Sequence, residues 1–213
     1  MASKPVIINA GVEPTPANPH SHLPLLGDAA GEAGPQGIRT LYGVLRPEYR
    51  GHRNSLVTFV ATKLTVAAPP ETPAWTVTAY RAEVLLPPHA DDRLLDPRTL
   101  IETVETEHPP GGEARATYVT LTWTPPRLHL QYEVGRRLAR WLVDEFGVAV
   151  LLIQHVPARA ASTAQPHVHL IVPGPRRIMP WGGYGDYVKP LCRDGGRQLI
   201  VDRLAGLVEE AAS

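Results

Sequence analysis

The alternation of apolar and polar positions is clearest in the C-terminal half of the chain. Residues 117–123 alternate between the two kinds of side chain, as a strand does when one of its faces is buried. From Gln131 to Phe146 apolar residues recur every three or four positions, which predicts an amphipathic helix that ends at Gly147. A final helix is expected from about Arg197.

Between these two helices lie two apolar runs, residues 149–156 and 165–172, joined by a small and polar connector. This arrangement predicts two antiparallel neighbouring strands. In the N-terminal half, residues 38–45 and 56–66 are rich in β-branched and aromatic side chains and are interpreted as two strands or a hairpin.

The spacing of residues 92–105 predicts a helix with Pro97 near its start, and the period of residues 74–86 fits either a strand or a short helix. The order of elements predicts an α+β fold, in which helices pack on one face of an antiparallel sheet.

Residues 1–36 are rich in Pro, Gly and Ala and lack a sustained period, so we expect a disordered tail followed by a single domain over residues 37–213. His20 and His22 lie in this tail between two prolines, where a solvated loop is the expected structure.

Composition narrows the class of protein. A chain of 213 residues with 43% hydrophobic content fits one soluble globular domain. Cys192 is its one cysteine, so an internal disulfide and a cysteine-rich zinc site are excluded and a reducing cytoplasm is expected. The sequence contains neither a long apolar run nor a secretion signal, so no association with a membrane is expected.

The net charge is zero overall, but basic residues dominate the C-terminal half. Between Arg127 and Arg203 ten arginines and one lysine face six acidic residues, a net charge of +5. Because arginine binds phosphate oxygens through two parallel hydrogen bonds, this bias favours a partner that carries phosphate. An arginine-rich genome would explain the bias equally well.

Three histidines on the predicted strand pair form the main candidate site. His167 and His169 are two residues apart, so in a strand they point to the same face, and His155 lies on the neighbouring strand. Three imidazoles that converge from adjacent strands are a pattern of metal ligands, whereas the structural alternative is a stacked pair of rings beneath a loop. Three neutral nitrogen ligands suit Mn²⁺ or Zn²⁺ better than Mg²⁺.

The order strand, helix, histidine strand, followed by Gln165-Pro-His-Val-His169-Leu-Ile-Val and a basic pair, resembles the HUH endonuclease superfamily, in particular the MobA/MobL-type relaxases of mobilisable plasmids. The resemblance covers roughly residues 117–208. It implies a divalent metal ion (Mn²⁺, Mg²⁺ or Zn²⁺) held by His155, His167 and His169.

The resemblance also implies a tyrosine that attacks a phosphate of single-stranded DNA at an origin-of-transfer-like site and stays joined to the 5′ end, together with accessory mobilisation proteins. In the resembled relaxases this tyrosine lies in an Ala-Tyr-Arg context, which Tyr80 matches. Tyr42 and Tyr49 are alternatives, and Tyr184 and Tyr187 rank lower because they follow the histidines too closely. Four basic residues after the histidine strand are candidates for DNA binding: Arg176, Arg177, Lys189 and Arg193.

The sequence departs from the family in having Gln165 where the relaxases usually have Asn, and in a longer loop after His155 that lacks an acidic residue. A relative that has lost its activity therefore stays an alternative. A histidine-triad nucleotide hydrolase or transferase, with His169 as nucleophile, is a second alternative, although Ile171 replaces its third histidine. A third is a non-catalytic protein whose arginines and Trp181–Tyr187 loop bind single-stranded DNA.

Overall fold

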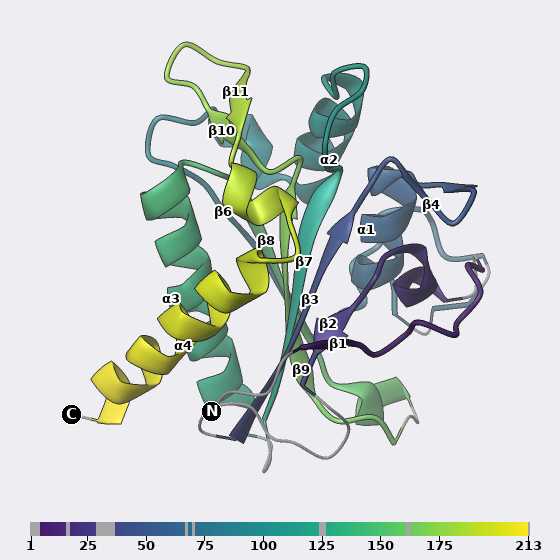
Figure 1. Ribbon diagram of the computed structural model, residues 1–213, viewed down its shortest axis with the longest axis vertical. Helices are drawn as coiled ribbons and strands as arrows, with labels where there is room; N and C mark the ends of the chain where they lie inside the picture. Colours follow the sequence, from purple (N-terminus) through teal and green to yellow (C-terminus); the bar gives the residue numbers. More distant parts are fainter. Residues whose placement is uncertain are drawn as a thin grey trace.

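The computed structural model describes residues 5–15, 18–28, 37–66, 68–69, 71–123, 127–160 and 163–212. Within these residues the chain forms a seven-stranded sheet in the order β1-β2-β3-β7-β9-β8-β6, in which every neighbouring pair is antiparallel (Figure 1). The strands are β1 (Val6–Ile7), β2 (Leu26–Gly27), β3 (Ile38–Leu45), β6 (Arg81–Leu85), β7 (Ala116–Trp123), β8 (Val150–His155) and β9 (His167–Pro173). The predicted strands at residues 117–123, 149–156 and 165–172 are thereby confirmed.

Four α-helices and two short hairpins complete the described part of the chain. The helices are α1 (Leu56–Leu64), α2 (Pro97–Thr106), α3 (Leu128–Phe146) and α4 (Gly196–Ala212), and the hairpins are β4–β5 (Glu48–Tyr49, His52–Arg53) and β10–β11 (Arg176–Ile178, Tyr184–Tyr187). Short 3-10 helices are η1 (Pro19–His22), η3 (Asp92–Leu95), η4 (Pro157–Ala160) and η5 (Lys189–Cys192). Helix α3 ends at Gly147, which adopts a left-handed conformation with φ of 65°.

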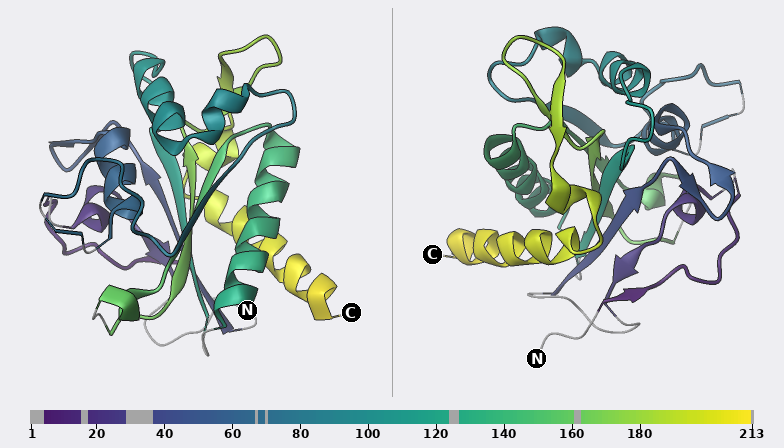
Figure 2. Two further views of the ribbon diagram at one scale, coloured as in Figure 1. Left: turned by 180° about the vertical axis from the view of Figure 1, so that it is seen from behind. Right: turned by 45° about the horizontal axis from the view of Figure 1, so that its top comes forward.

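Helices cover both faces of the sheet (Figure 2). Alternate residues of β8 separate into two cores, with Val150 and Leu152 packed in the core of α3 and α4, and Leu151 and Ile153 in the core of α1 and α2. The expected α+β class with an antiparallel sheet is confirmed. The expectation that helices pack on one face was incomplete. The central strands are apolar on both faces, so helices pack against both.

Residues 56–66 do not form the expected strand, because Leu56–Leu64 form helix α1. Their β-branched residues suggested a strand, but the buried residues follow helical spacing, and they are Leu56, Phe59, Val60, Lys63 and Leu64. The Ser55 hydroxyl caps the helix by accepting a hydrogen bond from the Thr58 N–H. Burial of one helix face therefore outweighed the local preference of the β-branched side chains.

The described N-terminal residues, 5–15 and 18–28, are ordered against the sheet, so the expectation of a disordered tail was wrong for them. Asn9 holds the segment together, since its side chain donates to the carbonyls of His20 and Leu23 and accepts from the Leu25 N–H. His22 is buried, donates to the Thr15 carbonyl at 2.9 Å and stacks on His52. The other tail residues, 1–4, 16–17 and 29–36, lie outside the described part of the chain.

The candidate histidines and the hairpin β10–β11 lie at opposite ends of the sheet. His155 ends β8 and His167 begins β9, so both lie at the lower end of the sheet in Figure 1, beside η4. The hairpin β10–β11 follows the opposite end of β9 and projects from the top. None of the helices in the described residues is long and apolar enough to cross a membrane.

Candidate metal centre

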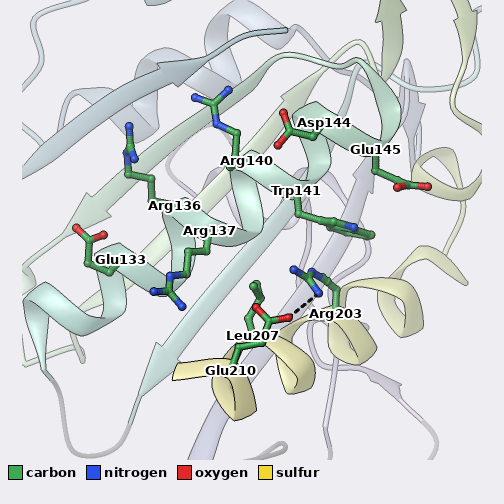
Figure 3. A pocket seen from close by; sticks show the side chains of 10 residues that line it. All are labelled: Glu133, Arg136, Arg137, Arg140, Trp141, Asp144, Glu145, Arg203, Leu207 and Glu210. Carbon is green, nitrogen blue, oxygen red and sulfur yellow. Dashed lines mark hydrogen bonds and ion pairs between the residues drawn. The ribbon is translucent and has the colours of Figure 1, made fainter. Parts of the chain in front are cut away.

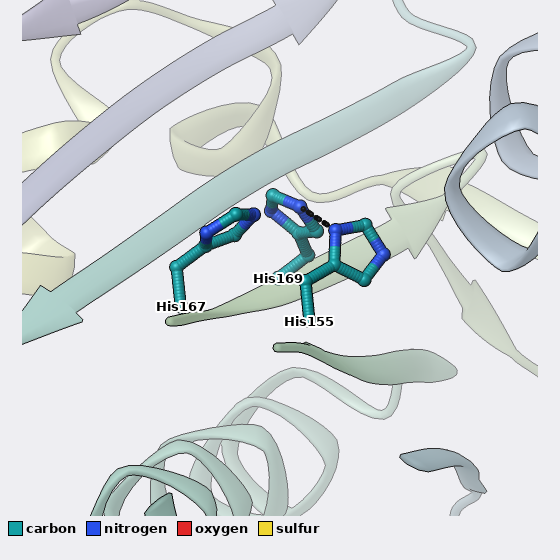
Figure 4. Close-up of side chains that lie close together, drawn as sticks. All are labelled: His155, His167 and His169. Atoms are coloured by element: carbon teal, nitrogen blue, oxygen red, sulfur yellow. Dashed lines mark hydrogen bonds between the residues drawn. The ribbon is translucent and has the colours of Figure 1, made fainter. Parts of the chain in front are cut away.

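His155, His167 and His169 converge on one face of the strand pair β8–β9 (Figure 4). His155 and His167 are directly opposite each other across the two strands. One ring nitrogen from each histidine lies within 4.8 Å of the others. His155 and His169 are buried and His167 is half-buried, so the structure brings the three predicted ligands together in a sheltered site.

Hydrogen bonds to backbone carbonyls fix the proton positions of two rings. His155 donates from Nε2 to the carbonyl oxygen of Lys63, and His167 donates from Nδ1 to that of Gln165, each over 2.7 Å. Because a carbonyl oxygen only accepts, each ring carries its single proton on the bonded nitrogen. The lone pairs of His155 Nδ1 and His167 Nε2 are then available to a metal ion, an arrangement typical of metal-binding histidines.

His169 is held by hydroxyl groups instead of a carbonyl. Its Nδ1 lies 2.9 Å from both the Tyr118 and the Thr120 hydroxyl oxygens. Its Nε2 lies 3.2 Å from Nδ1 of His155. A hydroxyl group can donate or accept, so these two hydroxyl contacts suit His169 Nδ1 with or without a proton.

Burial keeps the three imidazoles neutral. It lowers the pKa of His155 to about 4, and it also lowers the pKa of His167 and that of His169, the last of these well below the usual value. Metal ions bind the neutral form of imidazole. Since the cluster formed by the described residues consists of histidine alone, its donor set fits Zn²⁺ or Mn²⁺ better than Mg²⁺.

The C-terminal end of α1 positions both His155 and the segment that leads to Tyr80. The last carbonyls of a helix lack partners within the helix. Here the Lys63 carbonyl accepts from His155, and the Leu64 carbonyl accepts from the N–H groups of Thr78 and Ala79. The Tyr80 N–H then donates to the Gln154 carbonyl at 3.1 Å, which extends the pairing of β6 and β8 towards the site.

Tyr80 and His155 line one cavity of about 220 Å³, together with Arg159. The Arg159 guanidinium lies 4.9 Å from the centre of the Tyr80 ring. Tyr80 is 38% exposed.

The other tyrosines considered from the sequence lie elsewhere. Tyr42 is fully buried on the opposite face, where its hydroxyl donates to the carbonyls of Leu191 and Arg193. Tyr49 belongs to the hairpin β4–β5, and Tyr184 and Tyr187 belong to β11 at the other end of the sheet.

The four basic residues expected to bind DNA are not near the histidines. Pro173 lies six positions after His167 along β9, which places β10 roughly 20 Å away at about 3.3 Å per residue. Arg176 donates to the carbonyls of Glu107, Tyr184 and Gly185, and Lys189 pairs with Glu113. Arg177 is exposed on β10, and exposed Arg193 follows η5, where its carbonyl accepts from Tyr42 on the opposite face of the sheet.

Sequence reasoning missed several residues that surround the histidines: His20, Lys63, Tyr118 and Thr120. Tyr118 and Thr120 share a face with His169, because Thr120 pairs with His169 across β7 and β9. The alternation of residues 117–123 indicated that shared face, but the order of the strands was needed to place it beside the histidines. The interpretation of residues 56–66 as a strand hid Lys63, and the expected tail hid His20.

A further cavity, of about 520 Å³, lies between α3 and α4 (Figure 3). Four arginines and four acidic residues line it, and Arg203 pairs with Glu210 across 3.2 Å. The charges are balanced, and the cavity is separated from the histidines by the sheet.

Comparison with known proteins gives a likeness in fold. No protein-family model matches the chain, and no curated protein matches it in sequence. A solved structure described as the molecular basis of vancomycin resistance transfer in Staphylococcus aureus is similar, with a TM-score of 0.50 and 20% sequence identity over 61% of this chain and 67% of that chain. At this identity the likeness shows a shared fold.

Proposed function

We propose that the protein is an HUH-type, MobA/MobL-like nuclease that cuts single-stranded DNA and joins itself to the 5′ end, in the mobilisation of a plasmid. The convergence of His155, His167 and His169, with the lone pairs of two rings directed by carbonyl hydrogen bonds, is the observation that carries this proposal. The fold shared with the vancomycin resistance transfer structure supports it.

A divalent cation bound by the three histidines would withdraw charge from a non-bridging oxygen of the scissile phosphate. Tyr80 is the proposed nucleophile. Its hydroxyl oxygen forms a bond to phosphorus, the bond between phosphorus and the 3′ oxygen breaks, and the departing 3′ oxygen takes up a proton while the tyrosine proton passes to solvent. The cavity shared by Tyr80, His155 and Arg159 supports this role.

The sheet offers positive charge on both sides of the histidines. Arg39 pairs with Thr122, Thr122 with His167, and His167 with His155, so the four side chains form one cross-strand row on the same face. Arg39 is exposed, roughly 10 Å from His167 at about 4.8 Å per strand. On the other side stands exposed Arg159. A DNA strand along this row would meet a guanidinium on each side of the reacting phosphate.

The histidine-triad alternative is disfavoured by the position of His169. This side chain is 1% exposed, and both of its ring nitrogens are engaged by neighbouring side chains. A nucleophile must reach the phosphorus of a substrate, and a buried ring whose two nitrogens both have partners is not open to one.

The proposal is tested by incubating the protein with fluorescent single-stranded plasmid-transfer DNA and Mn²⁺, and then separating the products in denaturant. We expect a covalent protein–DNA adduct that disappears in Tyr80→Phe and in His167→Ala. Tyr49→Phe is the matched control, because it removes another tyrosine hydroxyl away from the cavity, and it should keep the adduct. An adduct that persists in Tyr80→Phe would reassign the nucleophile, and absence of an adduct with every DNA and metal would contradict nuclease activity.

A further inference from the structure

A chain of hydrogen bonds leads from His169 through Tyr118 to the N-terminal segment. The Tyr118 hydroxyl lies 2.9 Å from His169 Nδ1 and 3.2 Å from His20 Nε2. Tyr118 is fully buried and His20 is half-buried. The rings also pack together, with centroids 5.6 Å apart for His20 and Tyr118 and 5.1 Å apart for Tyr118 and His169.

Without a metal ion, the directions of these bonds follow from the carbonyl of Lys63. Because His155 donates Nε2–H to that carbonyl, its Nδ1 can only accept, so the contact of 3.2 Å requires His169 to donate from Nε2. His169 Nδ1 then has no proton and accepts from the Tyr118 and Thr120 hydroxyls. The Tyr118 oxygen, in turn, accepts a hydrogen bond from the Nε2–H group of His20.

A metal ion at the site needs the opposite arrangement. The nitrogen of His169 that faces His155 must offer its lone pair, so the single proton of the ring moves to Nδ1. That N–H can be accepted by Thr120 or Tyr118, but the Tyr118 hydroxyl can no longer donate to His169. Tyr118 is fully buried, so its hydroxyl hydrogen needs another acceptor. His20 Nε2, 3.2 Å away, can accept it.

Given the proposed metal site, we propose that His20 and Tyr118 are positioning residues. Their hydrogen bonds reverse direction when metal binds, which lets His169 become a ligand. Each residue stays neutral throughout. The proton of His169 moves from Nε2 to Nδ1, that of His20 from Nε2 to Nδ1, and Tyr118 keeps its proton but turns it from His169 to His20. Imidazole suits the end of such a chain because the same nitrogen can donate in one tautomer and accept in the other.

Through these hydrogen bonds the N-terminal segment is connected to the proposed metal site. His20 is the second residue of η1, and the Asn9 side chain donates to the His20 carbonyl. Outer partners of a ligating histidine affect metal affinity by about 10- to 100-fold. The docking of η1 is therefore coupled to the binding of metal, although no residue of η1 belongs to the three-histidine cluster.

The test measures Zn²⁺ affinity by competition with a chelator, and ring tautomers by long-range ¹H–¹⁵N NMR. In the wild type, addition of Zn²⁺ should move the His169 proton from Nε2 to Nδ1 and the His20 proton in the same sense. His20→Phe keeps a ring but offers no hydrogen bond, so it should weaken Zn²⁺ binding about 10-fold or more. His20→Gln should bind Zn²⁺ nearly as well as the wild type, because its amide can present either a donor or an acceptor.

Tyr42→Phe is a control on the other face of the sheet. It removes a hydroxyl of a fully buried tyrosine that donates to two carbonyls, and its Zn²⁺ affinity should be unchanged. If the wild type binds Zn²⁺ and His20→Phe binds it equally well, the positioning role is wrong while the metal site stands. A His169 proton that is already on Nδ1 without metal would also overturn the inference. If the wild type binds neither Zn²⁺, Mn²⁺ nor Mg²⁺, both the inference and the proposed metal-dependent function fail.

Discussion

His155 donates a hydrogen bond of 2.7 Å to the backbone carbonyl of Lys63, which joins strand β8 to the last turn of α1. The side chain of the same lysine lies inside the protein, with its ammonium nitrogen 5.3 Å from the ring centroids of both Phe59 and Tyr118. Lys63 is 4% exposed, and burial lowers its pKa to about 7. One residue therefore holds a candidate metal ligand by its backbone carbonyl and brings a poorly solvated charge close to that ligand.

Replacing Lys63 by Met should stabilise the metal-free protein at pH 6. The folded protein binds the lysine proton less tightly than the unfolded chain, whose lysine pKa is 10.5. The penalty is therefore complete below about pH 7 and disappears as the pH rises towards 10.5. Each unit of pKa difference corresponds to about 1.4 kcal/mol, so a gain on the order of a few kcal/mol is expected.

The measurement is denaturant unfolding of both proteins from pH 6 to pH 10 in the presence of a chelator. Subtracting one protein's unfolding free energy from the other's removes the pH dependence of the groups that both proteins share. It should shrink steadily as the pH rises above about 7. A constant difference would show that the Lys63 ammonium is as well solvated in the folded protein as in the unfolded chain.

Acid should destabilise the protein through its buried histidines. Burial lowers the pKa of His155 to about 4 and that of His20 to about 3, from 6.5 in the unfolded chain. Both groups are neutral in either state above pH 6.5, and as the pH falls below this value the unfolded chain takes up protons that the folded protein does not. Unfolding free energy measured in chelator should therefore fall as the pH drops from 6.5 towards 4.

His155→Gln should reduce this dependence on pH, whereas replacement of exposed His129 by Gln should leave it unchanged. Equal acid sensitivity in the two variants would place the proton uptake elsewhere in the chain.

Saturating Zn²⁺ should raise the unfolding temperature at pH 7.5 in the wild type and in His129→Gln, because ligand that binds the folded state stabilises it by mass action.

The sequence predicted the three metal-binding candidates because they depend on local rules. His167 and His169 share a face by the alternation of a strand, and the connector of small and polar residues predicts that β8 and β9 are neighbours. The contributions of His20 and Lys63 could not be predicted in this way, because each reaches the site from a distant segment. Lys63 is 92 residues from His155 and His20 is 98 residues from Tyr118, so only tertiary packing brings them together.

Helix α3 packs closely against strand β9 at Gly135, where a larger residue would contact Val168. A Cβ atom at Gly135 would lie 2.9 Å from Cγ1 of Val168, the residue between the candidate ligands His167 and His169, and 3.4 Å from Cδ1 of Leu152. Alanine favours a helix over glycine by about 1 kcal/mol, but overpacking a core costs about 1–3 kcal/mol. Gly135→Ala should therefore lower the free energy of unfolding and also weaken Zn²⁺ binding, because Val168 cannot move without β9.

Gly206→Ala is the control for helix propensity. Its Cβ atom would have the Arg203 guanidinium as its nearest neighbour, at 3.9 Å, so the substitution fits within α4. Unfolding in denaturant should show that it stabilises the protein slightly, by about 0.5–1 kcal/mol, with Zn²⁺ affinity unchanged. If Gly135→Ala behaved like Gly206→Ala, the close contact between α3 and β9 would have no energetic consequence.

Binding of single-stranded DNA should depend on the arginines beside the histidines more than on those at the hairpin β10–β11. Arg39→Gln and Arg159→Gln each remove an exposed guanidinium next to the site, and each should weaken binding of an oligonucleotide. The slope of log affinity against log salt should fall by about 0.7 for each phosphate contact that is lost. Arg176 is occupied by three carbonyls and Lys189 by Glu113, so Arg176→Gln and Lys189→Gln should leave the slope unchanged.

Fluorescence anisotropy at several salt concentrations measures these slopes in Tyr80→Phe protein, in which the proposed covalent step is blocked. A reduced slope for Lys189→Gln but not for Arg39→Gln would move the DNA to the far end of the sheet, where Trp181 is 81% exposed and could stack on bases. In that case the histidines would lie roughly 20 Å from the bound DNA. They could then reach only a part of the DNA that extends beyond the hairpin. The two sets of arginines therefore distinguish a DNA strand that crosses the histidines from one that binds at the hairpin end.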